Sequence, residues 1–146
     1  MIDFSSDPPN RDDWGDVEMD QDMIHAWSIY GGKKLKELVS LPGFDFEIRC
    51  VDLFDMPDSV FCYYAEEFLN YLVHDESESN DFGLKVAAYL DVMEIKRESA
   101  PDLCIVFWRR LLLLLDKVAE KVERSEMDAD LKAMLSAQLS KIKALG

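Results

Sequence analysis

The most apolar part of this sequence, residues 103–115, reads LCIVFWRRLLLLL. Arg109 and Arg110 interrupt it, and it is shorter than the roughly 20 residues that a membrane-spanning helix needs. Nearly continuous apolar character over this length is typical of a helix that is buried on all sides. We therefore expect residues 103–115 to form the central helix of a soluble protein, covered by the other helices.

Helical periodicity continues on both sides of this central segment. Apolar side chains three and four residues apart recur in residues 20–30, 33–40, 55–74, 80–98 and 125–145, and this spacing places them on one face of a helix. Pro57 and Pro101 fit the first turn of helices that would begin near them. The sequence predicts a mainly α fold, a single-domain bundle of four to five helices over residues 20–146.

One segment departs from the helical pattern. Residues 44–50, FDFEIRC, alternate apolar and charged side chains, which is the period of a half-buried strand. A single strand has no partner for its backbone hydrogen bonds, and no second alternating run occurs in the chain. We expect an extended connector lying on the helices, with an edge strand or a dimer-forming strand as the alternative.

The first 19 residues have a different character. They combine Pro8 and Pro9 with many acidic residues and show no apolar period, so we expect residues 1–19 to form an acidic, mobile tail. Phe4 and Trp14 are the exceptions, because each large apolar side chain gains about 2 kcal/mol if it docks in a groove of the folded body.

Negative charge is concentrated in one half of the chain. Residues 1–80 contain nineteen Asp and Glu against five Lys and Arg, whereas residues 81–146 contain eleven of each. The first half therefore carries the whole net charge of −14. Such a field attracts a basic partner and repels nucleic acid and anionic membranes.

The cysteines indicate a reducing compartment. Cys50, Cys62 and Cys104 are odd in number, and their spacing matches neither a disulfide framework nor a zinc motif. We expect three buried thiols. The first residues are acidic where a signal peptide would be basic and then apolar, so we expect a cytoplasmic protein.

Candidate catalytic and metal-binding patterns are incomplete. Asp22 and His25 share a helix face, but His74 has no acidic residue at the matching spacing that a di-metal bundle requires. The acidic loop at residues 75–81 lacks the glycine of a calcium loop. No glycine-rich phosphate loop is present, and no cysteine or serine stands in a pattern with histidine. We predict no enzyme activity, no cofactor and no metal.

A candidate binding surface lies in residues 61–78. The aromatic side chains of this region cannot all face one way at helical spacing, so at least one of Tyr63 and Tyr71 is expected at the surface beside Glu66 and Glu67. An exposed tyrosine among carboxylates suits recognition of a cation. The alternative is that the rings only complete the core. The predicted partner-binding residues are Tyr63, Glu66, Glu67, Tyr71, Asp75, Glu76 and Glu78.

These features favour a non-enzymatic acidic protein that neutralises or regulates a basic macromolecule. By composition, the first class to consider is a bacterial immunity-type inhibitor of a toxin. The alternative is a helical regulatory or structural subunit, or a secretion chaperone, whose charge serves only solubility. The composition leaves the oligomeric state open.

Overall fold

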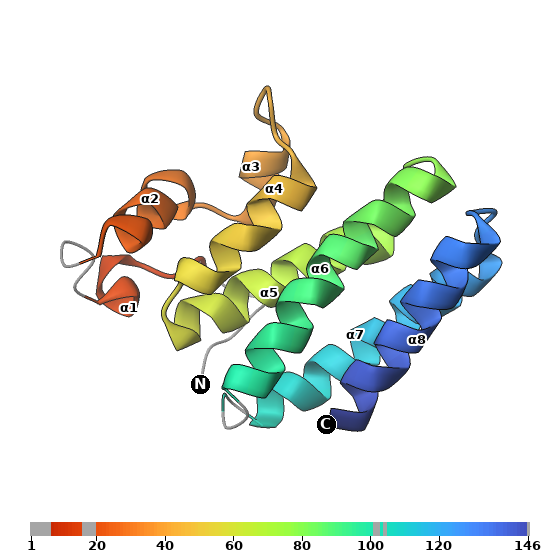
Figure 1. Ribbon diagram of the computed structural model, residues 1–146. Coiled ribbons are helices and arrows are strands. Elements are labelled where there is room, and N and C mark those ends of the chain that lie inside the picture. Colours follow the sequence, from red (N-terminus) through yellow and green to blue (C-terminus); the bar gives the residue numbers. More distant parts are fainter. Residues whose placement is uncertain (1–6, 16–19, 101–102, 104, 146) are drawn as a thin grey trace. The chain divides into compact units, whose positions relative to one another are not determined.

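The computed structural model describes residues 7–15, 20–100, 103 and 105–145, which form eight α-helices, one 3₁₀ helix and no strand (Figure 1). The mainly α prediction is confirmed, and the predicted count of four to five helices is too low. The helices Arg11–Trp14 and Phe46–Cys50 have only four and five residues, which is too short to show a repeating apolar face. The elements are α1 (Arg11–Trp14), α2 (Gln21–Tyr30), α3 (Leu35–Val39), α4 (Phe46–Cys50), η2 (Val51–Asp55), α5 (Asp58–His74), α6 (Ser79–Ser99), α7 (Ile105–Arg124) and α8 (Ala129–Leu145).

The chain divides into two compact units, residues 1–68 and 69–146, and the boundary falls inside α5. The first unit holds α1 to η2 and most of α5, and the second holds the end of α5 with α6, α7 and α8. The predicted division into a mobile tail of residues 1–19 and a domain of residues 20–146 stays a prediction. Phe4 lies outside the described residues.

The core of the first unit is aromatic. The ring of Trp14 meets that of Trp27 edge-on at 5.6 Å, and the Tyr30 and Tyr64 rings lie 5.0 Å apart. Trp14 is buried and is the last residue of α1. The first turn of this short helix is capped by Asn10 and Asp13, which form a capping box. Such pairs add attraction beyond the area they bury, so short helices are held together here by ring packing.

Residues 44–50 do not form the extended connector or strand that their alternation predicts. They enter α4, whose first turn is capped by the Asp45 carboxylate accepting a hydrogen bond from the Ile48 amide at 3.2 Å. Phe46 and Cys50, four residues apart, are buried, whereas Ile48 between them is exposed. Alternation over only seven residues is compatible with both the strand period and the helix period. The Asp45 cap favours the helix.

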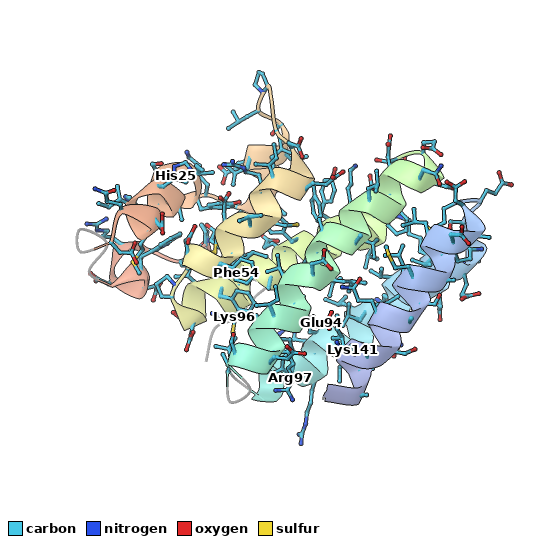
Figure 2. The ribbon with its side chains drawn as sticks, in the orientation of Figure 1. His25, Phe54, Glu94, Lys96, Arg97 and Lys141 are labelled. Carbon is cyan, nitrogen blue, oxygen red and sulfur yellow. The ribbon has the colours of Figure 1, made fainter. Side chains whose placement is uncertain are left out.

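The second unit packs α8 against α6 and α7. Figure 2 shows Glu94 of α6 and Lys141 of α8 pointing toward each other, and these side chains form an ion pair. The amide of Gln138 donates to Asp91 at 2.7 Å. Lys121 of α7 donates to the carbonyl of Leu72 at 3.0 Å, close to the last turn of α5. Carbonyls near a helix end lack partners within the helix, so this lysine supplies one.

Helix α7 is amphipathic rather than buried on all sides. Leu111 and Leu115 are fully buried, whereas Leu113 is 68% exposed. Arg109 and Arg110 are also exposed. The expectation of a covered central helix is therefore wrong for this face, because a run of leucines does not itself report which side meets a neighbour. Among the described residues, no helix is both long and apolar enough to cross a bilayer.

Candidate binding surface

The predicted binding residues on α5 are mostly inside the protein. Tyr63 and Glu66 are buried, and Glu67 is half-buried. The Tyr63 ring packs edge-on against Tyr64 at 4.9 Å. Burial, followed by the charge of Glu67, raises the pKa of Tyr63. Tyr63 is therefore not a surface anchor, because α5 is buried on all sides from residue 60 to 66. For Tyr63, the alternative that the rings only complete the core holds.

Tyr71 and Asp75 belong to a polar group that holds the second unit together. The Lys85 amine lies 3.3 Å from the Asp75 carboxylate and donates to the Ser77 hydroxyl at 2.7 Å. It also lies over the Tyr71 ring, 5.4 Å from its centre. All three partners are half-buried. These contacts give both residues a structural role at the α5–α6 connection.

Glu76 and Glu78 are the exposed members of the predicted set. Glu78 caps α6, because its carboxylate accepts hydrogen bonds from the amides of Asn80 at 3.0 Å and Asp81 at 3.4 Å. The seven predicted residues therefore do not assemble into one continuous exposed patch. Residues 61–78 instead combine a buried part of α5, the polar group around Lys85 and an acidic loop.

A different acidic surface forms in the first unit, where the start of α2 lies near η2. Burial first, and then the charges of Asp22, Asp52 and Asp20, raises the pKa of Asp55. His25, exposed on α2 (Figure 2), lowers it. Helix α2 packs against η2, so charges from both elements act on the Asp55 carboxyl. We call Asp20, Asp22 and Asp55 the acidic face.

Asp52 is the buried neighbour of this face. The Tyr30 hydroxyl donates to its carboxylate at 2.9 Å, and the Arg49 guanidinium lies 3.3 Å from the same oxygen. Burial raises the pKa of Asp52, although both partners and His25 act to lower it. Asp52 therefore ties α2 to η2, and the acidic face depends on that junction.

Exposed apolar side chains lie on α4 and η2, the segment that ends at Asp55 of the acidic face. Ile48 and Val51 are 57% and 58% exposed, and Phe54 is 39% exposed. They follow one another at intervals of three along the continuous segment α4–η2, so they share one side of it. We call these three residues the apolar ridge. The ridge was not predicted because residues 44–50 were expected to be extended, although exposed apolar side chains recur every three residues in 48–54.

The described thiols and possible metal ligands do not form a further candidate site. Cys50 and Cys62 are buried thiols, as predicted, and Cys104 lies outside the described residues. Burial, followed by the charge of Glu47, raises the pKa of the Cys50 thiol, which disfavours the reactive thiolate. Within the described part of the chain, no three His, Cys, Asp or Glu side chains are arranged to hold a metal ion.

Comparison of the chain with known protein families, curated proteins and solved structures finds no match. The kind of partner is therefore inferred from the acidic face and the apolar ridge. Carboxylates beside exposed apolar side chains suit a cationic partner that also offers apolar groups, because the charges steer the encounter and the apolar contacts slow dissociation.

Proposed function

We propose that this chain is a non-enzymatic partner-binding protein that neutralises or regulates a basic protein, and that an immunity-type inhibitor of a toxin is the first class to test. The observation that carries the proposal is the charge of the first unit. Residues 1–68 contain sixteen Asp and Glu against five Lys and Arg. A net charge of −11 on one unit attracts a cationic surface from several ångströms away at low salt.

The acidic face supports this proposal because its carboxylates come from separate elements. Asp20 and Asp22 lie at the start of α2, and Asp55 ends η2, more than 30 residues later. The charges of Asp22 and Asp20 add to burial in raising the pKa of Asp55, and a nearby cation would offset their repulsion. A basic partner therefore gains more here than at isolated acidic residues.

The test removes charge from this face without changing its shape. In the variant Asp20→Asn, Asp22→Asn, Asp55→Asn, the asparagine at position 20 still caps α2, where the Asp20 carboxylate accepts from the amide of Asp22 at 2.9 Å. The control, Asp81→Asn, Glu120→Gln, Asp130→Asn, removes the same charge from exposed positions of the second unit. Both are immobilised and exposed to lysate of the native cells at low and high salt.

The proposal predicts that the wild-type chain and the control retain one stoichiometric basic protein at low salt and release it at high salt. The acidic-face variant loses it at both salt concentrations. If all three chains capture the same proteins, or none in stoichiometric amount, the charge serves only solubility and the proposal is wrong.

A further inference from the structure

The apolar ridge is exposed on a segment that is otherwise well packed. Phe46, Cys50 and Leu53 on the opposite side of α4–η2 are buried. The fold therefore has enough apolar side chains on this segment to fill its core, and three more face solvent. A contiguous apolar surface bordered by polar residues is typical of a protein interaction site.

A pocket of about 190 Å³ opens at the Ile48 end of the ridge. Its apolar lining comes from Ile29, Leu38, Leu41, Phe44 and Ile48. An apolar cavity of about 150 Å³ is large enough to hold a benzene ring. This pocket can therefore receive one aromatic or branched aliphatic side chain.

The charges around the ridge select the partner. Residues 41–58, which carry the ridge, contain five acidic residues and one basic residue, Arg49, which pairs with Asp52. Lys33 lies at the other side of the pocket, where its amine donates to the Ile29 carbonyl at 3.3 Å, so the acidic side is the one that carries the ridge. Asp45, Glu47 and Asp58 are exposed. A second copy of the chain would bring an equally acidic face against this one, and like charges facing each other across an interface are unfavourable. A basic partner meets no such penalty.

We propose that the apolar ridge and its pocket dock a basic, amphipathic segment of a partner protein, with one apolar side chain of that segment in the pocket. This inference rests on the proposed function and adds the surface and the chemistry of the docked segment. The lysines or arginines of the segment lie against the surrounding carboxylates, and its apolar side is buried on Ile48 and Val51.

The experiment uses the full chain and an 18-residue amphipathic helical peptide of leucine and lysine as the probe, with a leucine and glutamate peptide of the same pattern as its counterpart. Binding is measured by titration at low salt, and the contacted residues by amide chemical shifts. Ile48→Ser and Val51→Ser each remove one side chain of the ridge. Ile95→Ser is the matched control, because Ile95 is a helical isoleucine of the second unit that is 53% exposed.

We expect Ile48→Ser to weaken binding of the lysine peptide roughly tenfold, which is the loss typical of an interface anchor. Val51→Ser should weaken it as well. Ile95→Ser leaves it within about twofold of wild type. Amide shifts concentrate in residues 41–55. Helical circular dichroism of each variant verifies that the fold is intact.

Other outcomes overturn the inference. If the acidic-face variant weakens binding while both ridge variants do not, the docking surface is wrong and the charge-based function stands. Equal binding of the glutamate peptide would mean that the ridge does not select a basic partner. If the wild-type chain sediments as a dimer that Ile48→Ser dissociates, the occupant is a second copy. If neither peptide binds, the ridge is not a docking surface, and the lysate capture tests the function separately.

Discussion

The hydroxyl of Tyr30 on α2 donates a hydrogen bond to the buried carboxylate of Asp52 on η2, with 2.9 Å between the two oxygens. This bond joins residues 22 positions apart and places a carboxylate where water has little access. Arg49 pairs with the same oxygen. Two partners lower the cost of the buried charge without removing it, because burial still raises the pKa of Asp52.

The raised pKa of Asp52 makes a prediction about pH. The folded-state pKa of Asp52 lies above the unfolded value of 3.8. Protonated Asp52 therefore contributes to the free energy of unfolding below the unfolded pKa, and this contribution is lost as pH rises through the folded pKa. Asp52→Asn cannot ionise. We expect its free energy of unfolding, relative to wild type, to increase from pH 4 to pH 7 in urea titrations. A flat difference between Asp52→Asn and wild type across this pH range would contradict the prediction.

The hydroxyl of Tyr64 closes the end of α2. It lies 2.8 Å from the Tyr30 carbonyl oxygen and 2.6 Å from that of Lys33. Removing the hydroxyl takes a donor from the part-buried Lys33 carbonyl, whereas the Tyr30 carbonyl still accepts from the Lys33 amide at 2.9 Å, so Tyr64→Phe should lower the free energy of unfolding by about 0.5–1.5 kcal/mol. Tyr71→Phe is the control, because Tyr71 is half-buried and water can replace its contact. Equal losses in the two variants would contradict the capping role.

Gly31 is required by a close approach rather than by its backbone angle, since its φ is −50°. A Cβ there would lie 2.7 Å from the Trp27 carbonyl oxygen and 2.8 Å from the indole ring. Gly31→Ala should therefore destabilise the protein by about 1–3 kcal/mol in thermal or urea unfolding.

Gly83 provides the comparison for this substitution. A Cβ at Gly83 would meet only side-chain atoms, a Leu131 methyl carbon at 2.7 Å, the Met127 sulfur at 3.2 Å and the Leu131 Cγ at 3.3 Å, and alanine favours a helix interior by roughly 0.5–1 kcal/mol, which offsets part of the cost of moving them. We expect Gly83→Ala to stay within about 1 kcal/mol of wild type. A smaller loss at position 31 than at position 83 would show that the contact with Trp27 is not what requires glycine.

The leucine run of α7 offers a test of burial with one residue type. Leu111 is 1% exposed and Leu113 is 68% exposed. Leu111→Ala leaves a cavity and should cost about 2–5 kcal/mol, whereas Leu113→Ala should change stability by less than about 0.5 kcal/mol. Leu114 is half-buried, and its alanine variant should fall between them. Urea unfolding followed by circular dichroism ranks the three.

The sequence predicted the fold class because long helices carry a repeat that short motifs cannot imitate. In α8, Leu135, Leu139 and Ile142 are buried as their spacing indicates. The same reasoning failed for residues 44–50, where Phe46 and Cys50 fit both a strand and a helix. The Asp45 cap resolves this choice, and a cap can be recognised from sequence only when the helix that it starts is already expected.

The candidate surface was harder to predict than the fold. At least one of Tyr63 and Tyr71 was expected at the surface beside Glu66, because a helix usually has one exposed face. In the structure Tyr63 and Glu66 are buried and Tyr71 is half-buried. The acidic face joins Asp22 to Asp55, and no local pattern relates residues so far apart. Only the total charge of the first half of the chain was readable in advance.

The tryptophans are divided between the two units in a useful way. Trp14 and Trp27 contact each other in the first unit, and Trp108 lies in the second, with the Arg97 guanidinium 5.1 Å from its ring centre. Replacing Trp108 by phenylalanine leaves emission from the first unit alone, and replacing the other two leaves emission from the second. Each half of the molecule thus has its own intrinsic fluorophore, and unfolding curves recorded from the two show whether the halves lose structure together or in sequence.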